Sequence, residues 1–194
     1  NDSTTLATLT NTGTTGVIDA TQDRHAYTIT ITNSADAGDI LSLDNVTSVS
    51  INLESLSTLT GTLAEVEGVF TLDDDSKVSL GASPSVALTL SDASIAVDQA
   101  NTLAAQTSGV ITATIYEGTY TALNGLNETT NNYALTLTEQ ISVTNVNTLQ
   151  GKTVGVITAT ISNGAITDLV NLTNTQSNSN YTITITDTGS QTAA

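Results

Sequence analysis

The phrases Tyr133-Ala-Leu-Thr-Leu-Thr138 and Ile157-Thr-Ala-Thr-Ile161 decide the fold class of this chain of 194 residues. In both phrases apolar and small polar residues alternate, which is the pattern of a strand with one buried face. Threonine, isoleucine and tyrosine also favour strand backbone, because branched and ring side chains suit a pleated surface. The phrases therefore predict strands with aliphatic residues on one face and threonines on the other.

Both phrases recur along the chain. Copies and variants of the first start at residues 27, 86, 133 and 181, copies of the second start at 111 and 157, and a looser copy starts at 49. The starts at 111, 133, 157 and 181 are 22 to 24 residues apart, a period that is typical of repeat architectures. The interval between 49 and 86 is longer, so we expect an irregular unit at about 54–85 with a longer helix and an extra strand at 77–80.

Apolar residues at a spacing of three separate the predicted strands. This spacing places three side chains on one side of a short helical turn. The triads are Ile40, Leu43 and Val46; Val97, Ala100 and Leu103; Tyr120, Leu123 and Leu126; Val143, Val146 and Leu149; and Ile166, Leu169 and Leu172. Each repeat therefore consists of a strand, a helical turn and a polar turn, and we expect Ser94 and Ser142 to cap two of the helical turns.

These patterns predict a mainly β fold: a parallel β-solenoid with coils of about 23 residues and short helical turns, forming a single repeat domain over residues 1–194. Stacked coils would pair each strand with its equivalents at a spacing of about 4.8 Å. Tandem β-sandwich domains are the alternative, because they too use short alternating strands. The helical triads favour the solenoid, since a sandwich does not need them.

The composition excludes several classes of function. Three basic residues stand against nineteen acidic ones, and the formal net charge of −16 leaves too few cations to neutralise nucleic-acid phosphates. No apolar run reaches about 18 residues, so we expect no membrane span. The chain has no cysteine, which excludes disulfides, thiol nucleophiles and thiolate metal sites, and with the acidity favours an extracellular location.

Longer stretches carry a family resemblance. Residues 59–70 (LTGTLAEVEGVF), 86–103 (VALTLSDASIAVDQANTL) and 131–162 (NNYALTLTEQISVTNVNTLQGKTVGVITATIS) resemble the threonine-rich repeats of giant secreted or cell-surface bacterial proteins, notably cyanobacterial ones. The resemblance implies a surface layer, an adhesin or an extracellular fibre, and it supplies no catalytic residues. The chain lacks the Gly-Gly-x-Gly-x-Asp nonapeptides of calcium-binding repeat proteins.

Residues that could carry catalysis or bind a metal are sparse. His25 is the one imidazole, and no Gly-x-Ser-x-Gly phrase accompanies it, so we expect no catalytic residue and no enzyme. The acidic run Asp73, Asp74 and Asp75 is the candidate calcium site, because hard cations prefer several carboxylate oxygens from a loop. A solvated acidic loop is the alternative. No other cofactor is expected.

The outward threonines of the predicted strands form a candidate ice-binding or ligand-binding face. Threonines within one strand would lie about 6.6–7 Å apart and those on neighbouring strands about 4.8 Å apart. The alternative is that threonine is simply well suited to an exposed strand face. The residues are Thr112, Thr114, Thr136, Thr138, Thr158, Thr160, Thr182 and Thr184.

From these observations we expect a non-enzymatic structural protein of the cell surface or extracellular space, whose repeats build a fibre or a surface layer. Neither end carries a polar capping unit, so we expect end-to-end self-association or a slice of a longer repeat protein. The alternative is a binding module, either an adhesin that contacts surface glycans or an ice-binding protein. Asn-x-Thr sequons are candidate glycosylation sites, at Asn45, Asn127, Asn171 and Asn180.

Overall fold

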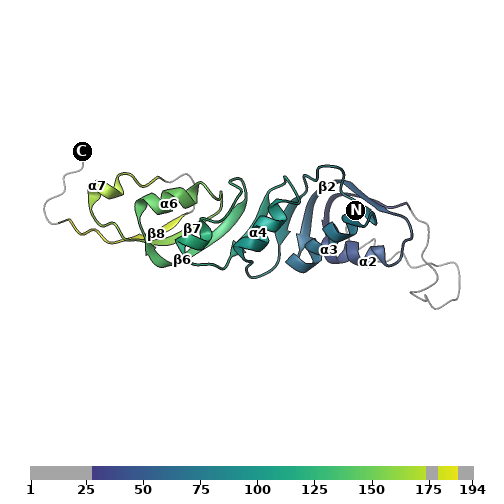
Figure 1. The fold of residues 1–194 in the computed structure, drawn as a ribbon, viewed down its shortest axis with the longest axis horizontal. Coiled ribbons are helices and arrows are strands. Elements are labelled where there is room, and N and C mark those ends of the chain that lie inside the picture. Colours follow the sequence, from purple (N-terminus) through teal and green to yellow (C-terminus); the bar gives the residue numbers. More distant parts are fainter. Residues whose placement is uncertain (1–27, 174–178, 188–194) are drawn as a thin grey trace. The chain divides into compact units, whose positions relative to one another are not determined.

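The computed structural model describes residues 28–173 and 179–187, which form eight strands and six helices in near-regular alternation (Figure 1). The strands are β1 (Thr30–Asp36), β2 (Ile51–Gly61), β3 (Val78–Ser79), β4 (Ala87–Leu90), β5 (Ile111–Ile115), β6 (Asn132–Ile141), β7 (Ile157–Ile161) and β8 (Asn180–Ile183). The helices are α2 (Ala37–Asp44), α3 (Leu63–Asp74), α4 (Val97–Ala104), α5 (Tyr120–Leu123), α6 (Val143–Gln150) and α7 (Ile166–Leu169). We call a strand and the helix that follows it a repeat unit.

The chain is a mixed α/β protein with parallel strands. All the strand pairings in the described part of the chain are parallel, whereas the β-sandwich alternative requires antiparallel pairs. The mainly β class is not confirmed, because the helices contain nearly as many described residues as the strands. Part of the helix comes from α2, α4 and α6, which are 8 residues long where the triads predicted single turns, and part from the 12-residue α3, the longer helix expected in the irregular unit.

The chain divides into two bodies, and each is described by itself. The first body comprises residues 1–93 and 103–112, and the second comprises residues 94–102 and 113–194. The single repeat domain expected over residues 1–194 therefore stays a prediction. Most repeat units fall wholly within one body.

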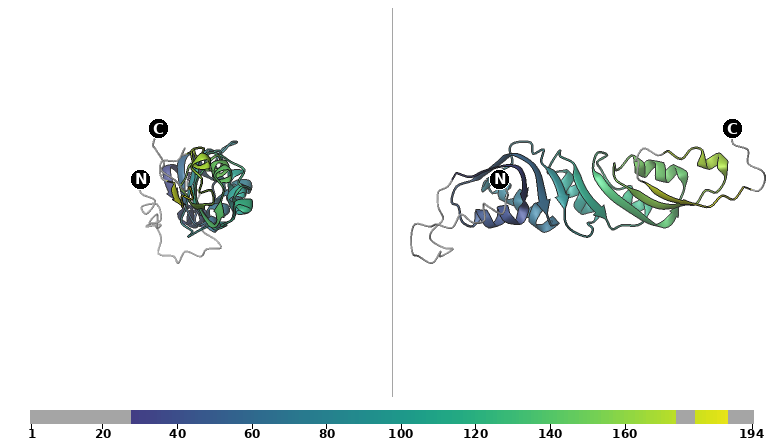
Figure 2. Two further views of the ribbon diagram at one scale, coloured as in Figure 1. Left: turned by 90° about the vertical axis from the view of Figure 1, so that its left-hand side faces the viewer. Right: turned by 180° about the vertical axis from the view of Figure 1, so that it is seen from behind.

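In the first body, β2 pairs with β1, β3 and β4, and β4 pairs with residues 111–112 of β5. Helices α2 and α3 lie side by side next to these strands (Figure 2). Ile40, Leu59 and Leu88 are fully buried between the two layers. The core of this body is therefore aliphatic, as the shortage of aromatic residues requires.

Helix α2 starts one turn earlier than its triad predicted. The Asp36 carboxylate accepts a hydrogen bond from the Gly38 amide at 2.9 Å and caps the helix. The buried residues are consequently Ala37, Ile40 and Leu43, while Val46 lies beyond the helix and is 41% exposed.

The irregular unit contains both elements that its length predicted. Helix α3 starts in a capping box, in which the Thr62 amide donates to Glu65 Oε2 at 2.8 Å and the Glu65 amide donates to Thr62 Oγ1 at 3.3 Å. The hydrogen bonds from the Thr62 backbone and hydroxyl hold the pKa of Glu65 below its ordinary value. The extra strand is β3, which adds to the side of β2.

In the second body, β7 pairs with β6 and with β8, and α6 lies against β7 (Figures 1 and 2). Ser142 caps α6 as expected: its hydroxyl accepts from the Asn145 amide at 3.2 Å. The α6 triad is buried, whereas α7 has no buried residue. The two helices therefore differ in burial although their triads are alike in sequence.

A threonine hydroxyl joins β6 to the segment that leads into β7. Thr153 Oγ1 lies 2.8 Å from the Tyr133 carbonyl oxygen and 3.1 Å from that of Asn131, and it accepts from the amides of Tyr133 and Gly155, both at 2.9 Å. Thr153 is fully buried, so water cannot replace these bonds. One hydroxyl thus satisfies several backbone groups of two successive repeat units.

We predict that Thr153→Val, which keeps the shape and removes the hydroxyl, lowers the free energy of unfolding by about 1–3 kcal/mol, because buried backbone groups lose a partner. Thr158→Val is the matched control on a half-buried strand position and changes stability by less than about 0.5 kcal/mol. Urea unfolding followed by circular dichroism measures both, and equal losses in the two variants would contradict the prediction.

Candidate functional site

The threonines expected on one face align only in part. In the first body Thr89 opposes both Thr60 and Thr112. In the second body Thr136 opposes Thr158, and Thr160 opposes Thr182. These two alignments give short ranks of threonines at strand spacing.

The rank is interrupted at Thr138. The β6–β7 register shifts between Thr136 and Gln140, so Gln140 rather than Thr138 opposes Thr160. Thr138 turns instead to Gly118, whose carbonyl oxygen accepts from the Thr138 amide at 2.9 Å and from its hydroxyl at 3.2 Å. Thr114 is exposed on β5, and Thr184 lies just past the end of β8. The ice-binding or ligand-binding face stays a prediction.

The acidic run Asp73, Asp74 and Asp75 lies at the C-terminal end of α3. Asp73 Oδ1 accepts from the Leu80 amide at 2.7 Å, Asp74 is the last residue of the helix, and Asp75 is its C-cap. The described residues contain no group of three or more His, Cys, Asp or Glu side chains that could hold a metal ion. Calcium at Asp73, Asp74 and Asp75 stays a prediction. His25 lies outside the described residues.

The feature that the sequence analysis missed is a set of side chains that cap a helix of the preceding repeat unit. In each case a carboxylate or amide oxygen accepts a hydrogen bond from the first amide of that helix. The pairs are Asp92 with Leu63 at 2.5 Å, Glu117 with Val97 at 3.0 Å, Glu139 with Tyr120 at 2.7 Å, Asn163 with Val143 at 3.0 Å and Asp187 with Ile166 at 2.6 Å. We call these five residues the cross-unit caps.

The cross-unit caps had a signal in the sequence. Each follows the last apolar residue of a strand phrase by two positions, as Glu117 follows Ile115 and Asn163 follows Ile161. The amide groups at a helix start have no partner within the helix, and the positive end of the helix dipole attracts a carboxylate. Each cross-unit cap therefore stabilises the start of the helix in the preceding repeat unit, and it favours one alignment of the two units.

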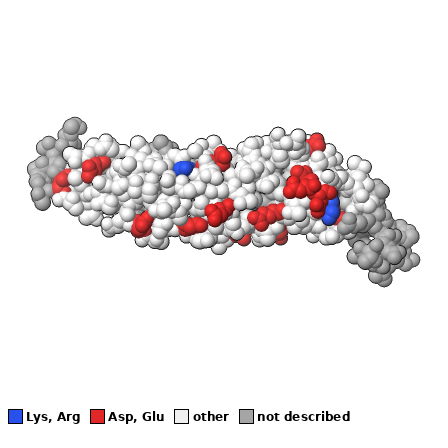
Figure 3. Space-filling view, in the orientation of Figure 1, with Lys and Arg blue, Asp and Glu red and all other residues white. Residues whose placement is uncertain are grey.

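Acidic side chains form small groups over the face seen in Figure 3, and the basic residues visible there are isolated among them. The basic residues in the described part of the chain are Lys77 and Lys152, and the Lys152 ammonium donates to the Leu126 carbonyl oxygen at 2.8 Å. The surface therefore carries a strongly negative charge, part of which lies at the cross-unit caps.

Two asparagines make a second cross-unit contact at equivalent positions. The Asn101 amide group donates to the Gly125 carbonyl oxygen at 2.9 Å, and its Oδ1 accepts from the Asn127 amide at 2.9 Å. Asn147 repeats the arrangement with the Asn171 carbonyl oxygen at 2.8 Å and the Thr173 amide at 3.0 Å. The same pair of asparagine hydrogen bonds therefore recurs at two interfaces between repeat units of the second body.

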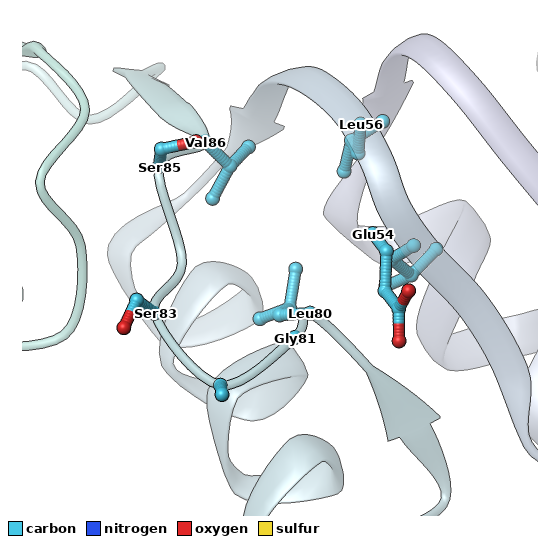
Figure 4. A pocket seen from close by; sticks show the side chains of 9 residues that line it. Glu54, Leu56, Leu80, Gly81, Ser83, Ser85 and Val86 are labelled. Carbon is cyan, nitrogen blue, oxygen red and sulfur yellow. The ribbon is translucent and has the colours of Figure 1, made fainter.

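The first body contains a shallow pocket of about 180 Å³ between β2 and the loop after β3 (Figure 4). Leu53, Leu56, Leu80 and Val86 form its apolar part. Glu54 supplies its one carboxylate, which accepts from the Ser79 hydroxyl at 2.9 Å. A single carboxylate that is already hydrogen-bonded offers no acid–base pair, so the lining gives no catalytic set.

Tyr133 is the one aromatic side chain that is fully buried in the described part of the chain. Its hydroxyl accepts from the Asn131 amide group at 3.0 Å. Burial raises the pKa of Tyr133 from 10.0 to about 12, which outweighs the lowering by the Asn131 hydrogen bond, while the nearby charge of Glu128 raises it further. The phenol is a core group rather than a candidate acid or base at neutral pH.

Comparison of the chain with protein-family models, with curated proteins and with solved structures finds no match. Within the described residues, no helix has both the length and the apolar character needed to cross a bilayer.

We predict that Glu117→Ala lowers stability by about 1 kcal/mol, because the Val97 amide at the start of α4 loses its cap. Glu117→Gln is the matched variant that keeps an acceptor oxygen, and we expect it to recover most of the loss, since Asn163 serves the same role at α6. Urea unfolding at neutral pH measures both variants. The prediction is wrong if the two substitutions cost the same.

Stability is also expected to fall as the pH rises above 10. Tyr133 loses its proton near pH 10 in the unfolded chain and near pH 12 in the folded chain. The contribution of the buried, protonated phenol to the free energy of unfolding is therefore complete below pH 10 and is lost between pH 10 and pH 12. Unfolding in urea at pH 8 and pH 11 measures the loss. Tyr133→Phe should reduce this pH dependence, whereas Tyr116→Phe, at a side chain that is 63% exposed, should leave it unchanged.

Proposed function

We propose that the chain is a non-enzymatic structural protein of the cell surface or extracellular space, whose repeat units stack as the coils of a parallel β-solenoid and extend by end-to-end association into a fibre or surface layer. The observation that carries the proposal is the set of cross-unit caps. A side-chain oxygen accepts from the first amide of the preceding helix once in the first body and four times in the second, and further repeat units could use the same contact.

The arrangement of the strands supports the proposal. Parallel strands at successive positions in the chain pair side by side, and the residues between them return through a helix, as a stacked coil requires. An array of this kind grows without a change of geometry, because each added unit presents the same edge as the last. The net charge of −16 favours extension at the ends over lateral clumping, since sides with the same charge repel.

The chemistry of the described surface supports a structural role over catalysis. The carboxylates that the sequence places after strands serve as helix caps, and the pocket lining contains one carboxylate. The resemblance to giant bacterial surface proteins favours the extracellular location and a layer or fibre. A calcium ion at Asp73–Asp75 would add a bridge between acidic surfaces, so the assembly is examined with and without it.

The expected outcome is concentration-dependent association of the purified chain into linear oligomers. Light scattering coupled to size exclusion measures the mass between micromolar and millimolar protein, and negative-stain electron microscopy shows the form of the particles. Calcium and a chelator are compared at each concentration. A monomer under every condition would refute end-to-end assembly and leave a binding module as the better hypothesis.

A further inference from the structure

The repeat unit around β8 exposes apolar side chains that its counterpart buries. Position by position, Ile183 and Ile185 correspond to Leu135 and Leu137 in the copy of the phrase at β6. Leu135 and Leu137 are 1% and 8% exposed, whereas Ile183 and Ile185 are 37% and 55% exposed. The difference arises because β7 covers β6, while no described strand pairs with the second edge of β8.

The interior shows what covers a strand of this type. The segment after each such strand reads Thr-x-Gly-Val-Ile-Thr-Ala-Thr, at 107–114 beside β4 and at 153–160 beside β6. In both places the threonine hydroxyl lies 2.8 Å from a strand carbonyl oxygen, that of Val86 or Tyr133. In both places the valine that follows the glycine accepts from the strand through its carbonyl oxygen: Val110 from the Leu88 amide at 3.0 Å and Val156 from the Leu135 amide at 2.9 Å.

The glycine of this segment is required by the contact. A Cβ atom at Gly109 would overlap the carbonyl group of Val86, and a Cβ atom at Gly155 would overlap that of Tyr133. Neither glycine has a left-handed backbone, so close approach rather than conformational freedom requires a residue without a side chain. We call the strand phrases that start at residues 27, 86, 133 and 181 tyrosine-type, because all but the one at Val86 begin with tyrosine. The phrase Thr-x-Gly-Val is therefore a docking sequence for one edge of a tyrosine-type strand.

A third copy of the docking sequence occurs near the start of the chain. Residues 14–21 read Thr-Thr-Gly-Val-Ile-Asp-Ala-Thr and match 107–114 and 153–160 at six of the eight positions, including the threonine, glycine and valine that make the contacts. These residues lie outside the described part of the chain. Their relation to the other copies comes from the sequence.

The strands that could receive this copy can be compared. The equivalent edges of β1, β4 and β6 are already paired with β2, β5 and β7. Strand β8 belongs to the same tyrosine-type phrase and has no described partner on that edge. Among the described strands of this type, β8 is thus the one whose receiving edge has no described partner, and the sequence supplies a further copy of the docking sequence at 14–21.

We propose that residues 14–21 of a second copy of this chain add to β8 as the next parallel strand. The proposal rests on the proposed function and names the surface through which the end-to-end contact forms. The register follows from β6, where Leu135 opposes Ile157 and Thr136 opposes Thr158. Ile18 of the second copy then opposes Ile183, and Asp19 opposes Thr184. Thr14 takes the place of Thr153 and bonds the Tyr181 carbonyl, and Gly16 lies against it.

Cysteine cross-linking tests the register, because the chain has no cysteine of its own. Asp19→Cys and Thr184→Cys chains are mixed and mildly oxidised, and a mixed dimer should form, since opposed Cα atoms of paired strands are within disulfide reach. The control pairs Asp19→Cys with Thr186→Cys, which lies two residues out of register. We expect a yield at least about tenfold higher for the first pair.

Gly16→Val tests the docking sequence itself. We expect it to weaken end-to-end association by about 100-fold or more, because the valine side chain would occupy the position of the Tyr181 carbonyl. Gly13→Val is the matched control just outside the docking sequence and should leave association unchanged. Sedimentation velocity over a concentration series measures the affinities, and urea unfolding of both variants verifies that the rest of the fold is intact.

The outcomes separate the two proposals. Association that Gly16→Val abolishes, with cross-linking in register, supports the docking of residues 14–21 on β8. Association that persists in Gly16→Val, with no cross-link in register, overturns this inference and leaves end-to-end assembly standing through another surface. A wild-type chain that stays monomeric overturns both. The Asp19→Cys, Thr184→Cys double variant could instead form a disulfide within one chain and no oligomers. That result would show that residues 14–21 pair with β8 of their own molecule, and it would overturn the proposal that a second copy binds there.

Discussion

Repeat units of this chain contain backbone groups whose hydrogen-bond partners lie in the next unit. The first amide of α6 needs Asn163, the amide and carbonyl of Tyr133 need Thr153, and the Leu135 amide needs Val156. An unsatisfied buried polar group costs about 1–3 kcal/mol, so removing one of these partners while the interface stays closed to water is costly. Much of the stability therefore comes from the interfaces between units, which makes folding cooperative along the chain. An uncovered strand edge retains the capacity to bind another strand.

The strands could be predicted because their pattern is local. The phrases at 111–115 and 157–161 coincide with β5 and β7, and the α4 and α6 triads are buried. The predictions failed where a hydrogen bond to a group outside the pattern decided the geometry. Asp36 caps α2 and moves its start, and the Gly118 carbonyl draws Thr138 out of the threonine rank. Alternation fixes which face a residue occupies but not how many residues a bulge takes up.

The candidate site was harder to predict than the fold. The threonine face follows directly from alternation, and its partial alignment reflects the register shift between Thr136 and Gln140. The cross-unit caps have a regular position in the sequence, yet without the structure they are indistinguishable from scattered charged and polar surface residues. Their role depends on which helix lies beside a strand end, and local patterns carry that information only once the parallel pairing is known. The acidic run at Asp73–Asp75 was the more visible signal because its members are adjacent.

One of the five cross-unit caps, Asn163, is uncharged. It shows which part of a carboxylate the helix start needs. Asn163 makes the same contact as Glu117, so the helix start requires an acceptor oxygen and not a negative charge. In the assembly proposed above, the carboxylates at the other four positions would add repulsion between neighbouring arrays. Parallel strands with open edges are prone to indiscriminate pairing, which charged side chains nearby reduce. Ile183 and Ile185 lie in a phrase, residues 181–186, that contains no charged residue, so in that assembly charge would not oppose pairing at this strand itself.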